Sequence, residues 1–228
     1  MPPVIPRIRN RRGGDDDDDR GPVTAVRRAW DRHVYPRLLE HVCGTRAIGA
    51  ERARWLGRVR GHTLEIGVGS GLNLPGLDPA RVTVVVGLDP SAPLLARAAA
   101  RAARVPVALV TGTAERLPFD AGRFDTVLVT YTLCSVDDPR RALAEARRVL
   151  RRDGTLVFVE HGAALAARRL RWQQRLTPLW RTVSGNCHLD RDIPRLIEAA
   201  GFAITELDAR DTDASVLSHA YSGVAAPA

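Results

Sequence analysis

The chain has 228 residues, 45% of them hydrophobic, and carries a formal net charge of +8 at pH 7. This length is enough for one well-buried domain, and no apolar run approaches the roughly 18 residues of a membrane span. All 34 basic residues are arginine. Ala, Gly, Val and Pro are also abundant, so we interpret the arginines as compositional. The alternative is attraction to nucleic acid or anionic lipid. Because no nucleic-acid-binding motif accompanies them, we expect no nucleic-acid partner.

The cysteines are three and widely spaced: Cys43, Cys134 and Cys187. An odd, low count argues against a disulfide framework and favours a reducing compartment. No C-x-x-C pair is present, so we expect no metal site. The N-terminal residues lack the apolar core of a secretory signal. We therefore expect a cytoplasmic protein.

Residues 1–20 mix Pro, Arg and Gly with the acidic run Asp15–Asp19, which predicts a disordered charged tail. We expect residues 21–228 to form a single domain. Apolar residues recur at helical spacing from Val26 to Leu38, and Pro36 is predicted to kink or divide that helix. Gly44 precedes a second helix at about 47–58. Residues 23–58 are thus predicted to form cap helices.

From residue 62 onward, short apolar runs alternate with Ala- and Arg-rich helical segments. Helices are predicted at 91–104, 139–151 and 190–200. Such alternation is typical of a doubly wound α/β sheet whose parallel strands are buried on both faces. The predicted strands are 62–67, 82–88, 106–110, 124–131, 155–161, 203–208 and 216–223.

Residues 165–190 interrupt this alternation and contain one apolar helical face surrounded by arginines. Pro178 predicts two helical pieces. Three interpretations stay open: packing onto the sheet, a lid over a substrate pocket, or an interface to lipid. The apolar face consists of Trp172, Leu176, Leu179, Trp180 and Val183.

The stretch "LEIGVGSG" places three glycines at alternate positions after a predicted strand: Gly67, Gly69 and Gly71. A dinucleotide fingerprint, G-x-G-x-x-G, would need its third glycine at Leu72 or Leu74. A phosphate-binding P-loop needs a lysine, and the chain has none. Both phosphate-binding patterns are therefore disfavoured.

Two carboxylates flank these glycines. Glu65 lies beside the loop and suits a cationic group such as an ammonium. Asp89 ends the next strand about 20 residues later and can accept hydrogen bonds from ribose hydroxyls. Ligands of open α/β sheets bind beyond the carboxyl ends of the strands. An amino acid joined to a ribose, with no demand for phosphate, indicates S-adenosylmethionine (SAM).

Four stretches, "LEIGVGSG", "GLDPS", "GTAERLPFDAGRFDTVLV" and "ALAEARRVLRRDGTLVFVEHG", resemble the successive motifs of class I SAM-dependent methyltransferases. The resemblance covers about residues 60–162. It implies a Rossmann-like seven-stranded sheet with the order 3-2-1-4-5-7-6 and the last strand antiparallel.

The resemblance also implies a cofactor site. Glu65 orients the amino-acid end of SAM, the three glycines lie along its methionine and ribose, and Asp89 holds the ribose. The adenine is bordered by residues 113–115 and packs near Leu88 and Pro90. The family often has Asp where Thr113 stands. The implied cofactor-binding residues are Glu65, Gly67, Gly69, Gly71, Asp89, Pro90, Thr113, Ala114, Glu115 and Thr130.

A narrower resemblance runs from about Trp30 to the C-terminus. The stretches "TLCSVDDP", "VEHG", "RWQQRLTPLW", "GNCHLDRD" and "HAYSGVA" resemble a small methyltransferase-like subgroup. It includes animal alkyl-thiol methyltransferases and bacterial phospholipid or ubiquinone-type methyltransferases. The chain departs from the animal enzymes at the N-terminus, where they carry a hydrophobic anchoring segment and this chain has a charged tail.

His161 directly follows the fifth strand, and its imidazole suits general-base catalysis. A structural histidine is the alternative. Tyr131 is predicted to line the methyl-transfer pocket. The predicted substrate-lining residues are Cys134, Trp172, Trp180 and His188.

We therefore expect SAM-dependent methyl transfer to a small apolar acceptor, in which proximity and desolvation provide much of the rate. A thiol is the preferred acceptor. The alternatives are N- or O-methylation of a phospholipid headgroup, a quinone-like phenol or a natural-product intermediate. A non-catalytic SAM-binding module and a dehydrogenase are alternatives of another class. Peripheral contact with lipid is a further candidate interaction.

Overall fold

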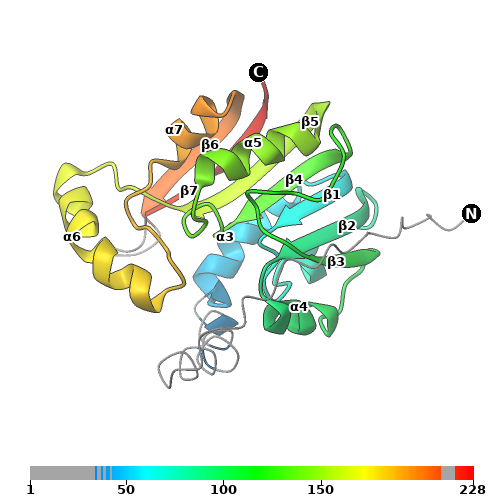
Figure 1. Ribbon diagram of the computed structural model, residues 1–228, viewed down its shortest axis with the longest axis horizontal. Coiled ribbons are helices and arrows are strands. Elements are labelled where there is room, and N and C mark those ends of the chain that lie inside the picture. Colours follow the sequence, from blue (N-terminus) through cyan, green and yellow to red (C-terminus); the bar gives the residue numbers. More distant parts are fainter. Residues whose placement is uncertain (1–33, 35–36, 38–39, 42, 212–218) are drawn as a thin grey trace, which may run out of the picture.

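The computed structural model describes residues 34, 37, 40, 41, 43–211 and 219–228. The predicted tail at 1–20 and the predicted break at Pro36 lie outside this part. Seven of the described segments form one sheet in the order β3-β2-β1-β4-β5-β7-β6 (Figure 1). Strands β1 to β5 run parallel, and β7 is antiparallel to both β5 and β6. The predicted fold class and strand order are confirmed.

The strands lie close to the predicted runs. The first four are β1 (Gly61–Ile66), β2 (Val82–Asp89), β3 (Val107–Thr111) and β4 (Phe124–Thr130). The last three are β5 (Leu150–His161), β6 (Phe202–Asp211) and β7 (His219–Pro227). β5 begins earlier than predicted because Leu150 leaves the preceding helix in an extended conformation and pairs with Phe124.

The helices alternate with these strands. They are α3 (Arg46–Leu56), α4 (Ala92–Ala99), α5 (Pro139–Val149), α6 (Ala167–Val183) and α7 (Ile193–Ala199), with a short 3-10 turn, η2 (Leu74–Gly76). The predicted helices at 47–58, 139–151 and 190–200 are confirmed within a few residues. α4 ends five residues before the prediction, just after Ala98, the last buried side chain of its apolar face.

Two apolar cores cover the two faces of the sheet. In β4, Val127 and Val129 join a core with α5 and α7, whereas Leu128 joins a core with α3 and α4. This alternation follows from the two-residue period of a strand. It leaves β4 buried on both faces, as expected of a parallel sheet between helical layers.

α6 differs from its prediction in two respects. It is one helix with Pro178 inside it, rather than two pieces. Its buried positions are Gln173 and Thr177, whereas Trp172 is 47% exposed and Leu179 72% exposed. The interpretation of the apolar stripe as core packing is therefore wrong for these two residues.

The docking of α6 is polar. The Gln173 amide accepts a hydrogen bond from the Ala164 N–H at 2.8 Å and donates one to the Gly162 carbonyl at 3.1 Å. These bonds satisfy backbone groups that β5 leaves as it ends. Figure 1 shows α6 projecting at the side of the molecule away from β2 and β3. Within the described part of the chain, no helix is both long and apolar enough to cross a membrane.

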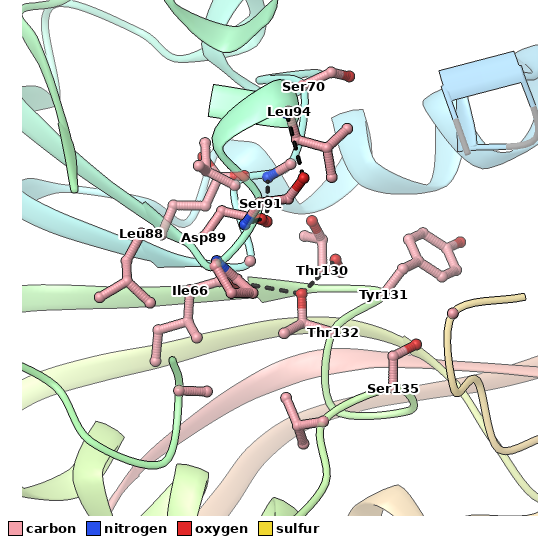
Figure 2. Close-up of a pocket in the computed structure, with 18 of the residues that line it drawn as sticks. Ile66, Ser70, Leu88, Asp89, Ser91, Leu94, Thr130, Tyr131, Thr132 and Ser135 are labelled. Carbon is pink, nitrogen blue, oxygen red and sulfur yellow. Dashed lines mark hydrogen bonds between the residues drawn. The ribbon is translucent and has the colours of Figure 1, made fainter. Parts of the chain in front are cut away.

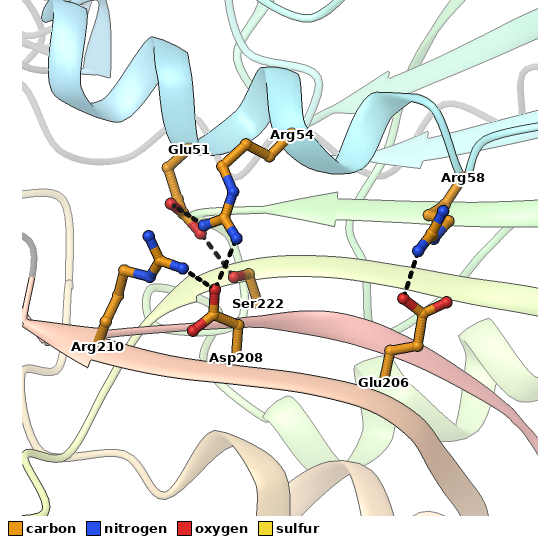
Figure 3. Close-up of polar contacts among 7 residues, drawn as sticks. All are labelled: Glu51, Arg54, Arg58, Glu206, Asp208, Arg210 and Ser222. Atoms are coloured by element: carbon orange, nitrogen blue, oxygen red, sulfur yellow. Dashed lines mark hydrogen bonds and ion pairs between the residues drawn. The ribbon is translucent and has the colours of Figure 1, made fainter.

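α3 is attached to the antiparallel strands through polar contacts (Figure 3). The buried Glu51 carboxylate accepts a hydrogen bond of 2.7 Å from the Ser222 hydroxyl. Arg54 pairs with Asp208 at 2.9 Å, and Arg58, just beyond the end of α3, pairs with Glu206 at 2.6 Å. Exposed ion pairs contribute little individually, so the buried Glu51–Ser222 bond is the main polar anchor of α3.

Gly67 closes the end of β1 in a conformation that only glycine tolerates well. Its φ is +72°, and an added Cβ would overlap the Thr132 side chain. Gly122 has a similar φ of +65° with open space around it. It is a matched control for backbone strain without steric overlap.

We expect Gly67→Ala to lower the free energy of unfolding by roughly 2–4 kcal/mol, because strain and overlap add. Gly122→Ala is expected to cost about 1–2 kcal/mol from strain alone. Urea titration of both variants measures the difference. Equal losses would contradict the close approach of β1 to Thr132.

Candidate active site

A cavity of about 410 Å³ opens where β1, β2 and β4 end (Figure 2). β1 lies between β2 and β4 in the sheet, so the chain leaves neighbouring strands in diverging directions at this point. Ten of the predicted site residues line this cavity, and their binding roles stay predictions. They are Glu65, Gly67, Gly69, Asp89, Pro90, Thr113, Ala114, Glu115, Thr130 and Tyr131.

The glycine loop brings backbone N–H groups to the cavity wall. Gly69 has a φ of +54°, and its N–H donates to Asp89 Oδ2 at 3.0 Å. An added Cβ at Gly69 would meet only the Gly67 carbonyl oxygen, 4.0 Å away. Gly71 does not line the cavity. A Cβ added at Gly71 would lie 2.8 Å from Leu74 Cδ1 and 3.2 Å from Ala98 of α4, so a glycine allows this close packing.

Asp89 ends β2 with its carboxylate largely buried at the cavity wall. Oδ1 accepts a hydrogen bond from the Ser91 N–H at 2.8 Å, and Oδ2 accepts one from Gly69. Burial raises the pKa of Asp89, and these two backbone bonds oppose the rise. A carboxylate has about four lone-pair positions, so Asp89 retains capacity for ribose hydroxyls.

Glu65 is 1% exposed, in the strand at the centre of the site. Its Oε1 accepts a hydrogen bond of 2.8 Å from Asn73 Nδ2, which also donates to Thr130 Oγ1 at 3.0 Å. Glu65 Oε2 and Asn73 Oδ1 are buried acceptors without a hydrogen-bond partner among the residues that the structure describes. Burial raises the pKa of Glu65 to about 7.

Arg52 is a site residue that sequence reasoning missed. It comes from α3, is 7% exposed and lines the cavity. Its Nη1 donates to the Cys43 carbonyl at 2.6 Å. Burial lowers the pKa of Arg52, while the Cys43, Tyr131 and Glu65 side chains oppose that change. The only sequence signal was an arginine within a predicted cap helix.

The far end of the cavity is bordered by the loop after β3 and the segment after β4. Glu115 Oε1 accepts a hydrogen bond from the Asp137 N–H at 3.2 Å, which joins these two walls. Ala114 is buried beside it. Thr113 lines this end of the cavity and offers a hydroxyl there.

Tyr131 directly follows β4 and lines the cavity. Its φ of +52° is unusual for a residue with a side chain. Its N–H donates to the Val159 carbonyl at 2.8 Å, which fixes this turn. Burial raises the pKa of Tyr131, so its phenol stays protonated at neutral pH.

The other predicted residues lie outside the cavity lining. His161 Nδ1 is 3.7 Å from Cys187 Sγ, and Cys134 is buried behind the turn after β4. Trp172 and Trp180 lie on α6, and the His188 N–H donates to the Cys134 carbonyl at 2.7 Å. The catalytic and substrate roles of these residues stay predictions.

The cavity residues fit the amino-acid end of SAM. An ammonium group has three donors and a positive charge. It could donate to both unpaired oxygens, Glu65 Oε2 and Asn73 Oδ1, and its charge would balance that of the Glu65 carboxylate. The Arg52 guanidinium at the same wall matches an α-carboxylate. Within the described ranges, no group of three or more His, Cys, Asp or Glu side chains is arranged to hold a metal ion.

Comparison with known proteins agrees with this geometry. Residues 64–158 match the family model described as "Methyltransferase domain". Thiol S-methyltransferase TMT1B of Rattus norvegicus is 40% identical over 85 residues, which cover 37% of this chain and 35% of that protein. Phosphatidylethanolamine N-methyltransferase of Cereibacter sphaeroides is 38% identical over 107 residues, covering 45% and 52% respectively.

A solved chain from the Haloferax volcanii complex of a methyltransferase with its Trm112 activator has the same fold. The TM-score is 0.66 at 19% identity, covering 88% of this chain and 97% of that one. The match to the rat protein spans about a third of that protein's length. The motifs, the strand order and these matches support a class I SAM-dependent methyltransferase domain in this chain.

Proposed function

We propose that this protein transfers the methyl group of SAM to a small apolar thiol in the cytoplasm. One observation carries the cofactor part of the proposal. Two buried acceptors, Glu65 Oε2 and Asn73 Oδ1, face a cavity and have no hydrogen-bond partner within the described residues. Such groups are costly unless a ligand satisfies them.

The chain's own residues bind and orient the cofactor in this proposal. Glu65 and Asn73 hold the ammonium, Arg52 holds the carboxylate, and Asp89 accepts the ribose hydroxyls. When bound, SAM supplies a methyl group on a positively charged sulfur. The protein's task is then to align the acceptor and exclude water.

The acceptor end is formed by Tyr131, Cys43 and Gly185, which line the same cavity on the side of α3 and α6. A protonated tyrosine and a half-buried cysteine suit an apolar acceptor. Similarity to thiol S-methyltransferases supports sulfur as the accepting atom.

A thiol acceptor reacts as its thiolate. The buried Arg52 guanidinium provides a positive field in the cavity, and a positive field favours the thiolate. Assignment of His161 as the general base stays a prediction, since its Nδ1 faces Cys187 and it does not line the cavity.

A second acceptor class is favoured by α6. Trp172 and Leu179 are exposed on a helix with five arginines and no acidic residue. This composition is typical of helices that lie on lipid surfaces. Phospholipid headgroups therefore form a separate arm of the activity test.

We expect Gly69→Ala to weaken SAM binding at least tenfold, because its methyl group would project from the loop that must approach the ligand. Gly69→Ala should lower the free energy of unfolding by the same amount as Gly122→Ala, since both glycines have positive φ and open space around them. Calorimetry with SAM and urea titration measure the two effects. Unchanged affinity would argue against this loop as the cofactor contact.

We expect SAM affinity to fall as the pH decreases through about 7, because the protonated form of Glu65 cannot pair with an ammonium. In the absence of SAM, the effect of pH on the free energy of unfolding has the opposite direction. The pKa of Glu65 is raised on folding, so its ionisation destabilises the protein as the pH rises from about 4.5 to about 7.

Glu65→Gln should therefore gain roughly 1–3 kcal/mol of stability relative to wild type between pH 5 and pH 8. The same variant should bind SAM weakly with little pH dependence. Melting curves and calorimetry across this pH range test both effects. A wild-type affinity that stays flat from pH 5.5 to 8 would contradict the ammonium contact.

A radiolabelled-methyl assay with alkyl thiols, amines, phenols and phospholipid vesicles tests the acceptor. We expect the thiols to give the highest kcat/KM. Preferred methylation of vesicle lipid or phenol would replace the thiol by that acceptor, and binding of SAM without any product would indicate a binding module. Tight NAD binding without SAM binding would overturn the cofactor assignment.

A further inference from the structure

All three cysteines gather near the acceptor end of the cavity, although they are far apart in sequence. Cys43 lines the cavity, Cys134 is buried after β4, and Cys187 is half-buried before α7. The segments that carry Cys134 and Cys187 are hydrogen-bonded to each other. The proposed methyl transfer needs none of these interactions.

Several backbone contacts hold Cys134 and Cys187 together. The Cys134 carbonyl accepts a hydrogen bond from the His188 N–H at 2.7 Å, and the Ser135 carbonyl accepts one from Asn186 Nδ2 at 2.9 Å. On the other side, the buried Glu160 carboxylate accepts from the Cys134 N–H at 3.1 Å. A disulfide between these cysteines would join two segments that are already hydrogen-bonded to each other.

The two thiols have different chemical environments. Interaction with Cys134 and with the nearby His161 lowers the pKa of Cys187, whereas interaction with Cys187 and burial raise the pKa of Cys134. Arg191 adds positive charge near both sulfurs, and Glu160 adds negative charge. Cys43 differs again, since burial raises its pKa. Of the three thiols, Cys187 is therefore the one favoured as a thiolate.

We propose that Cys187 and Cys134 form an oxidisable dithiol in which Cys187 reacts with a hydroperoxide and Cys134 resolves the product. The inference does not depend on the proposed methyl transfer. Its basis is a half-buried thiol whose Sγ lies 3.7 Å from His161 Nδ1, on a segment that is hydrogen-bonded to the one carrying a second, buried thiol. In reducing compartments such pairs serve as transient redox sites.

The chemistry balances with one peroxide. The Cys187 thiolate attacks a peroxide oxygen, the O–O bond breaks, and the leaving hydroxide is protonated to water, which leaves a sulfenic acid. The Cys134 sulfur then bonds to the Cys187 sulfur. The sulfenic oxygen departs as hydroxide and takes up the Cys134 proton to form a second water. Two thiols lose two electrons and two protons in total.

The test treats the full chain with hydrogen peroxide, blocks the remaining thiols and maps disulfide-linked peptides by mass spectrometry. We expect a Cys134–Cys187 link in wild type and in the matched control Cys43→Ser, reversed by dithiothreitol. Cys187→Ser should form no link. Cys134→Ser should leave a sulfenic acid on Cys187 that dimedone traps.

A measurement without substitutions guards against misfolded variants. In untreated wild type at pH 7, we expect iodoacetamide to alkylate Cys187 at least about tenfold faster than Cys43. Equal alkylation rates would overturn the proposal. So would a fast disulfide that contains Cys43, or retention of both free thiols at peroxide concentrations that oxidise Cys43.

Discussion

The position of β1 between β2 and β4 is the constraint on which the site depends. Chains leaving these neighbours diverge, so the space above β1 is not filled by a connecting loop. Three side chains at the carboxyl ends of these strands, Glu65, Asp89 and Thr130, then converge on that space. The glycine loop can approach Asp89 closely only because its residues adopt positive φ.

The same geometry explains the unusual electrostatics of the cavity. Burial in a strand between two helical layers removes water from the Glu65 carboxylate. The single hydrogen bond from the Asn73 amide does not compensate for this lost hydration, so the pKa of Glu65 is raised. Arg52 provides the opposite charge from another layer of the fold. The wall that results has both signs of charge within a short distance, which suits a zwitterionic amino acid better than a single ion.

The sequence predicted the sheet and most of the residues that line the cavity because their signals are local. The glycine spacing, Glu65 and Asp89 lie within one short stretch, and the strand order is implied by the resemblance of the motifs to a known family. Arg52 could not be found in this way, because α3 reaches the cavity through contacts with residues more than 140 positions away. Its helical pattern gives no indication of which arginine is buried.

α6 illustrates a second limit. Helical periodicity identified an apolar face correctly but could not show whether that face meets the sheet or solvent. The structure docks an adjoining face through the amide of Gln173, a polar contact that hydrophobic patterns do not detect. Pairing of His161 with Cys187 was likewise invisible, because it joins the end of β5 to the segment before α7.

Attachment of α3 to β6 and β7 has a consequence for the size of the functional unit. The segment that carries the recognisable motifs, residues 64–158, contains neither Arg52 nor the strands that hold α3 in place. A cofactor wall with both charges therefore requires segments from both ends of the described chain. Because Ser222 of β7 holds Glu51 of α3, the proposed amino-acid subsite is completed only after β7 has joined the sheet.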